Sequence, residues 1–173
     1  MKKILLVSFL IVSSFLGISQ EKFYIPQKDV KIATILVPDG WDSQYGDDFL
    51  MLSQEDRVCT SFVFGFRNTQ SIEKLQSFYD YIYATAGELI SDITWSEEDY
   101  DKVEGIDFNI IIDEGYGFFE DETGKFEKIN ISLFFLITKA KDTLAFIYLT
   151  SPDDEDSCED DFAGMILSVK PLK

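Results

Sequence analysis

The stretch "EKINISLFFLITKAKDTLAFIYLT", residues 127–150, decides the fold class. It holds two runs, 127–138 and 143–150, that are rich in β-branched and aromatic residues, and the polar tetrapeptide "KAKD" separates them. Such runs are typical of strands. Because a connection this short joins neighbouring antiparallel strands, the stretch predicts two consecutive antiparallel strands.

Five further segments predict strands by composition and by apolar residues at every second position. In the third of them Phe62, Phe64 and Phe66 alternate, which places all three on one face of a sheet. The segment from Gln20 to Asp29 is polar and predicts an irregular lead. The five predicted strands are residues 31–37, 48–53, 57–66, 92–99 and 103–113.

Two segments change from strand to helix periodicity. In residues 71–90 apolar residues recur at spacings of three and four, so they form one helical stripe, with Ser71 as the capping residue and Glu73 in the first turn. Residues 157–170 predict a second helix, capped by Ser157. The predicted inward residues are Ile72, Leu75, Tyr79, Ile82, Ala86 and Leu89 in the first helix, and Phe162, Met165 or Ile166, and Val169 in the second.

The element order is therefore three strands, a helix, four strands and a helix, or βββαββββα. Consecutive strands with short turns imply an antiparallel sheet, and two helices are available to cover it. The sequence predicts the α+β class, with about seven strands in the sheet.

The first 19 residues carry two lysines, an apolar run and small residues at Gly17 and Ser19, which is the pattern of a cleaved signal peptide. The run from Ile4 to Leu16 is short for a transmembrane anchor. We therefore expect a signal peptide at 1–19, a single domain at 20–173, and a periplasmic or secreted protein with no membrane insertion after cleavage.

The chain is strongly acidic, with 15 basic and 32 acidic residues in 173 and a net charge of −17. Without Lys2 and Lys3 the charge is −19. A surface this negative repels nucleic acid and anionic lipid, so neither is expected as a partner. A cation or a basic protein partner is compatible with it, and so is a surface that serves only solubility.

Three segments resemble the PsbP-like superfamily, which includes the DcrB-like bacterial envelope proteins and the Mog-type proteins. They are "ILVPDGWD" (35–42), "VEGIDF" (103–108) and "AFIYLTSPDDEDSCEDDFAGMILSVKPL" (145–172), which contains Ser168 near its end. The resemblance implies an α/β/α sandwich around an antiparallel sheet, over nearly all of residues 20–173. It also implies an accessory or partner-binding protein rather than an enzyme.

The chain has no histidine, which removes histidine-based nucleophilic catalysis and histidine metal ligation. It also lacks a G-x-S-x-G elbow, a P-loop and a G-x-G-x-x-G turn. Carboxylate pairs stay formally available, but with 32 acidic residues any spacing occurs by chance. The prediction is a protein that is not an enzyme and has no cofactor.

Cys59 and Cys158 are the only cysteines, and an even number in an exported chain favours a disulfide. The bridge would join the third predicted strand to the start of the last helix. The alternative is two unpaired thiols. Spacing alone does not choose between them.

The acidic stretch "SPDDEDSCEDDF" (151–162) allows three interpretations. It can be a solvated loop followed by a helix start, in which Glu159, Asp160 and Asp161 face the positive end of the helix dipole. It can be a cation site, such as a calcium site, or it can contact a basic partner. The candidate cation ligands are Asp153, Asp154, Asp156 and Glu159.

The segment 114–126 carries three glycines and predicts a loop. Phe118 and Phe119 on this loop, and Trp41 at the sheet end, are the candidate partner contacts. Folding of one phenylalanine onto the sheet is the alternative. We expect an exported, non-catalytic accessory or protein-binding module of the cell envelope, and a calcium-binding secreted protein is the alternative.

Overall fold

The computed structural model describes residues 20–26, 31–54, 58–67, 69, 71–96, 101–104, 108–121, 123–138, 142–153 and 155–172. For 101–104 and 155–157 it describes the backbone but not the side chains. The predicted signal peptide, 1–19, and Ile106 lie outside these residues.

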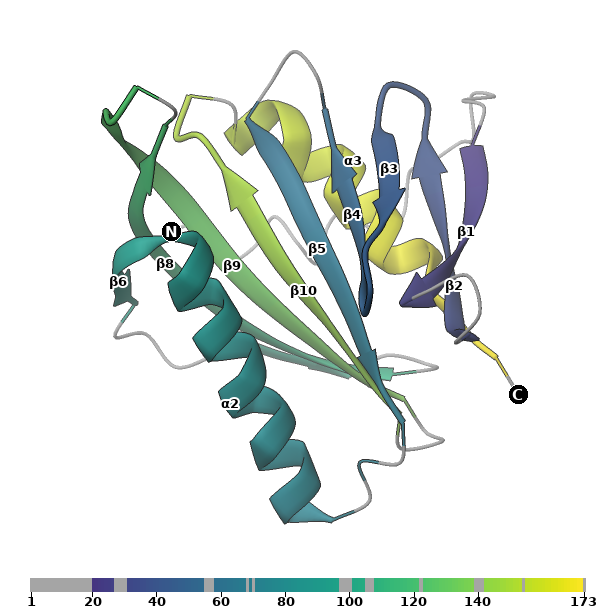
Figure 1. Cartoon of the computed structure of the whole chain (residues 1–173). Helices are drawn as coiled ribbons and strands as arrows, with labels where there is room; N and C mark the ends of the chain where they lie inside the picture. Colours follow the sequence, from purple (N-terminus) through teal and green to yellow (C-terminus); the bar gives the residue numbers. More distant parts are fainter. Residues whose placement is uncertain are drawn as a thin grey trace.

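An eight-stranded antiparallel sheet forms the centre of the molecule (Figure 1). The hairpin predicted at 127–150 lies in its middle, where β9 pairs with β10. Seven strands follow one another across the sheet, and β7 (Asp101–Glu104) pairs with β8 beside them. The seven, in spatial order, are β3 (Asp42–Tyr45), β4 (Phe49–Ser53), β5 (Cys59–Phe66), β10 (Thr143–Thr150), β9 (Phe126–Thr138), β8 (Phe108–Glu120) and β6 (Ser91–Trp95).

Three further strands form a second sheet that is not hydrogen-bonded to the first. Their order is β1 (Gln20–Pro26), β2 (Lys31–Pro38) and β11 (Lys170–Pro171). The prediction of an irregular lead at 20–29 is therefore wrong for the part that forms β1. Its first three residues, Gln20, Glu21 and Lys22, are polar, but Phe23 packs against the core and Ile25 is fully buried in it. Gly65 permits this packing, because a Cβ atom there would lie 2.8 Å from Pro26 Cδ and 2.9 Å from Ile32 Cδ1.

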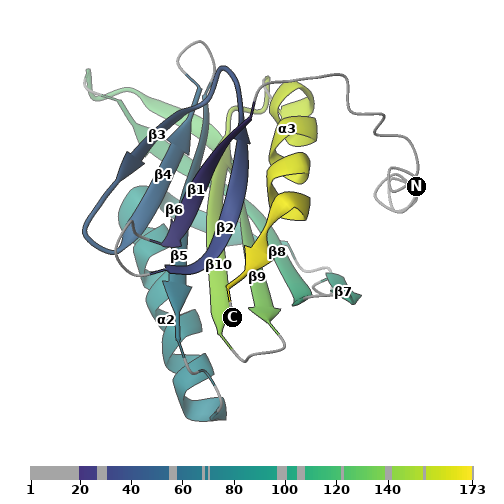
Figure 2. The same ribbon diagram turned by 90° about the vertical axis from the view of Figure 1, so that its right-hand side faces the viewer.

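The two predicted helices are α2 (Ile72–Leu89) and α3 (Glu155–Ser168). Figure 2 shows them on opposite sides of the main sheet. The small sheet packs into the same hydrophobic core as α3. The predicted sandwich of an antiparallel sheet and two helices is confirmed. Neither described helix is long and apolar enough to span a bilayer.

Each face of the main sheet has its own hydrophobic core. Under α2 lie the odd-numbered residues of β9 and β10 and the inward side of the helix, including Phe78, Ile82, Phe135 and Ile147. Under α3 and the small sheet lie the even-numbered residues of the same strands with Trp41, Cys59, Cys158 and Phe162. The all-buried pattern of β10 follows from its position between the two cores.

The stripe predicted for α2 is partly wrong at its start. Ser71 caps the helix as predicted, accepting a hydrogen bond from the Lys74 backbone N–H at 3.2 Å. Ile72, however, is 88% exposed, whereas Phe78 is buried. The first turn extends past the strand ends (Figure 1), so a side chain there has no sheet to cover.

The predicted loop at 114–126 is also wrong, because β8 runs on through its first half to Glu120. Gly115 and Gly117 belong to a close strand contact, whereas Gly124 lies in the turn at the tip of the hairpin. A Cβ atom on Gly115 would lie 2.6 Å from the Thr94 carbonyl oxygen, and one on Gly117 would lie 2.3 Å from Ile90 Cγ2. The strand predicted at 103–113 is correspondingly divided between β7 and β8, which pair with each other.

Candidate functional site

The free end of the β8–β9 hairpin carries a row of exposed aromatic side chains. Tyr116 and Phe118 on β8 and Phe126 on β9 are 39%, 36% and 58% exposed. The unbroken register pairs Phe118 with Lys128 and Glu120 with Phe126, so these side chains share the face of the sheet on which α3 lies. We call Tyr116, Phe118, Phe126 and Lys128 the aromatic strip.

Lys128 is held within the strip by one of its rings. Its ammonium group lies 4.1 Å from the centre of the Tyr116 ring, the arrangement of a cation–π contact. The other lysine of the hairpin end, Lys125, donates a hydrogen bond to Glu127 at 2.7 Å. Both cations of the hairpin end are therefore already engaged by groups of the protein.

The tip of the hairpin is an ordered turn. One carboxylate oxygen of Asp121 accepts hydrogen bonds from the Thr123 backbone N–H, the Thr123 hydroxyl and the Lys125 backbone N–H, at 2.8, 2.7 and 2.9 Å. The hydrogen bond from the Thr123 hydroxyl is the largest of the effects that lower the pKa of Asp121 below its ordinary value. The tip therefore keeps its negative charge at neutral pH.

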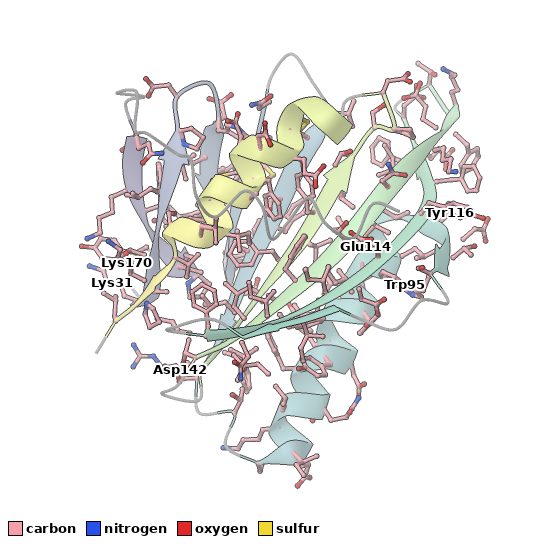
Figure 3. All side chains as sticks on the ribbon, turned by 180° about the vertical axis from the view of Figure 1, so that it is seen from behind. Lys31, Trp95, Glu114, Tyr116, Asp142 and Lys170 are labelled. Atoms are coloured by element: carbon pink, nitrogen blue, oxygen red, sulfur yellow. A yellow bond between two sulfur atoms is a disulfide. The ribbon has the colours of Figure 1, made fainter. Side chains whose placement is uncertain are left out.

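A shallow hollow of about 300 Å³ lies between β6 and β8 beside the strip. The Ser96 backbone N–H donates to the Glu114 carbonyl oxygen at 2.8 Å, which holds the end of β6 against β8 there. Trp95, Glu114 and Tyr116 are labelled in Figure 3, to the right of α3. The hollow is lined by Thr94, Trp95, Ser96, Glu114, Gly115 and Tyr116.

Phe118 and Phe119, predicted as a pair of partner contacts, lie at this end but on opposite faces. Neighbouring residues of a strand alternate, so Phe118 belongs to the strip while Phe119 points to the α2 side and is 46% exposed. The sequence did not single out Tyr116 or Phe126 as contacts. The alternation Tyr116, Phe118, Glu120 was a strand signal that the glycines between them obscured.

Trp41, the third predicted contact, lies far from the strip in the chain fold and is only 8% exposed. Its indole N–H donates to Asp161 Oδ2 at 3.2 Å, and the Gln54 side-chain N–H donates to the same oxygen at 3.3 Å. The ring is thus part of the core under α3, and Asp161 ties that helix to the "PDGWD" turn. A second hollow, of about 270 Å³, borders the turn.

Cys59 and Cys158 form a disulfide, with their Cα atoms 6.4 Å apart. The alternative of two unpaired thiols is therefore excluded. Both residues are fully buried in the core under α3. The bridge fastens the first turns of α3 to β5, as the sequence-based pairing required.

The predicted helix start in the acidic stretch is two residues late. Helix α3 begins at Glu155, so Ser157 lies within the helix and is not its cap. Asp153 precedes the helix and is exposed, Glu159 is exposed on it, Asp154 lies outside the described residues, and the Asp156 side chain is not described. No group of three potential metal ligands converges among the residues whose positions are described.

One titratable pair joins α2 to β8 on the opposite face. The Tyr83 hydroxyl donates a hydrogen bond to Asp113, and the Tyr83 ring packs edge-on against Trp95. Burial, and then the bond to Asp113, raises the pKa of Tyr83 above its ordinary value, so this hydroxyl stays protonated at neutral pH. The pair anchors the helix to the strand that carries the strip.

Two solved structures share the fold of this chain. The solution structure of cyanobacterial PsbP (CyanoP) from Synechocystis superimposes with a TM-score of 0.60 at 14% sequence identity, covering 94% of this chain and 99% of that one. The crystal structure of LpqN, involved in cell envelope biogenesis of Mycobacterium tuberculosis, gives a TM-score of 0.52 at 12% identity, covering 91% and 92%.

No protein-family model matches the sequence, and a search of curated proteins finds no match. The chain nevertheless has the PsbP-like fold over almost its whole described length, which confirms the resemblance seen in the sequence at the level of the fold.

Proposed function

We propose that this chain is an exported, non-catalytic accessory protein of the cell envelope that binds a protein partner through the aromatic strip. The observation that carries the proposal is the exposure of Tyr116, Phe118 and Phe126 in one row. Aromatic residues dominate the energetics of protein interfaces, and exposing a row of them to water is unfavourable. Such a row therefore marks a surface that a binding partner covers.

Three further features support the proposal. The first 19 residues have the pattern of an export signal, and a disulfide suits an oxidising compartment. The lack of histidine removes the usual acid–base catalysis at neutral pH. LpqN, which shares the fold, is described as involved in envelope biogenesis.

Site-specific photo-crosslinking in the native cell envelope tests the proposal. A photoreactive phenylalanine analogue replaces Phe118 or Phe126 in the strip, and in control chains it replaces Ile72 or Leu167. These two controls are 88% and 62% exposed and lie on helices α2 and α3.

We expect one discrete crosslinked protein from the strip positions and none from the two controls. The same product from all four positions, or no product from the strip, would contradict the proposal.

A further inference from the structure

From the charges around the strip we infer the chemistry of its partner, an inference that rests on the proposed function. The partner presents an exposed segment that combines aromatic or aliphatic side chains with lysine or arginine. The apolar side chains cover Phe118 and Phe126, and a cationic side chain enters the hollow bordered by Glu114 and Tyr116.

The first argument is the local charge. On the face of the strip β8 carries the described carboxylates of Glu114 and Glu120, and Asp121 follows in the turn. Against them stand Lys125 and Lys128, which are held by Glu127 and by the Tyr116 ring. A partner that brings its own cations is attracted to this border, whereas an acidic one is repelled.

The second argument is the chemistry of the hollow. Tyr116 already holds an ammonium group at 4.1 Å from its ring centre, which shows that cation–π geometry is accessible at this ring. Glu114 lies on the same face two residues away, and the hollow of about 300 Å³ is large enough for the end of a long side chain. An aromatic ring next to a carboxylate is a fitting environment for a lysine or arginine head group.

The third argument concerns the other occupants. A second copy of this chain would bring a further net charge of −17 and the same acidic border, so pairing of two strips joins like charges. Nucleic acids and anionic lipids are disfavoured for the same reason. A basic segment of another protein is therefore the occupant that the surface fits best.

Binding of two matched peptides to the disulfide-bonded protein tests the inference. One peptide is three repeats of Lys-Phe-Ser, the other is three repeats of Gln-Phe-Ser, and each carries an amino-terminal fluorescein for anisotropy. We expect the lysine peptide to bind at least 10-fold more tightly than the glutamine peptide, and its affinity to fall as salt is raised.

Variants locate the contact. Glu114→Gln together with Tyr116→Ala is expected to weaken the lysine peptide about 10-fold, whereas Tyr116→Phe, which keeps the ring, is expected to retain its binding. The charge control is Glu88→Gln on α2, an exposed acid away from the strip, which is expected to change nothing. A far-ultraviolet spectrum and a melting curve verify that each variant is folded.

Equal binding of both peptides, no binding of the lysine peptide, or an unchanged affinity in the double variant would overturn the inference. So would a concentration-dependent dimer, seen by light scattering, that Phe126→Ser abolishes, since the occupant would then be a second copy. The crosslinking experiment judges the proposed function separately, because it detects a partner of any charge.

Discussion

The face of the main sheet that α3 covers has two halves that use the same strands in opposite ways. In one half Phe134, Phe146 and Tyr148 pack against Phe162, whose ring stacks on Tyr148 with centroids 3.9 Å apart. In the other half, further along β8 and β9, aromatic side chains of the same face stand in solvent.

The two halves differ both in what lies over them and in the residues they present. In the covered half apolar residues take every second position, which is the pattern of a buried sheet face. In the open half Tyr116, Phe118 and Phe126 share their face with polar side chains, among them Lys128 and Asn130. The disulfide and the bond from Trp41 to Asp161 fix α3 over the first half. Among the described residues no helix lies over the second half in Figure 3, and its aromatic side chains are exposed to another molecule.

The largest loss of stability is expected from removing the disulfide that fixes α3 over the sheet. Replacing Cys59 and Cys158 by serine frees a loop of 99 residues and should lower the free energy of unfolding by roughly 4–5 kcal/mol in the chain-entropy model. Urea unfolding of the double variant and of the oxidised wild type measures it. Equal midpoints would mean that the bridge does not hold α3 in place.

Truncation of Phe162 should come next. Phe162→Ala empties the space between α3 and three aromatic rings and is expected to cost about 4 kcal/mol, within the usual range for a buried phenylalanine. Urea unfolding again measures it. A loss of under 1 kcal/mol would show that the covered half is not tightly packed.

A smaller loss of stability is expected from a change at the close contact between β6 and β8. Gly117→Ala places a methyl group 2.3 Å from Ile90 Cγ2 and 2.7 Å from the Ser91 carbonyl oxygen, so β6 must shift, at a cost of about 1–3 kcal/mol. Gly87→Ala is the control, since a Cβ atom there meets no atom within 4 Å and alanine favours the helix. If both variants melted at the same temperature, the close approach of β6 to β8 would be refuted.

The smallest effect on stability is expected in the strip itself. Phe126→Ala should change the free energy of unfolding by no more than about 0.5 kcal/mol, because the side chain is already more than half exposed. The same variant should weaken binding of the lysine peptide. A large loss of stability with unchanged binding would assign Phe126 to the fold and not to the contact.

Much of the fold could be predicted from the sequence, because the spacing of apolar residues indicates which side of a strand or helix is buried. The hairpin at 127–150, helix α2 and the inward side of α3 follow from apolar spacing. The two-residue strand β11 is too short to give a period, and the polar first half of β1 leaves only Phe23 and Ile25 to alternate. They are strands because β2 offers them hydrogen-bonding partners, which is a property of the tertiary structure.

The site was harder to predict for a related reason. Gly115 and Gly117 suggested a loop, yet in a strand they serve the close approach of β6. Phe118 was a candidate as one of two adjacent aromatic residues on that supposed loop, whereas Tyr116 and Phe126 become its neighbours only through the register of β8 and β9. Trp41 was a candidate because of its place at the end of the sheet, but it is buried in the core and its indole N–H donates to Asp161, 120 residues away in the sequence.

The position of α3 along the chain orders events during synthesis. A chain that emerges with its amino terminus first completes β10 at residue 150 before the segment 155–168 is available. Until then the even-numbered side of β10, including Phe146 and Tyr148, has no helix over it, and Cys59 has no cysteine to pair with. The nascent protein therefore passes through a stage in which both halves of this face are open, and oxidation of the thiols marks the end of that stage.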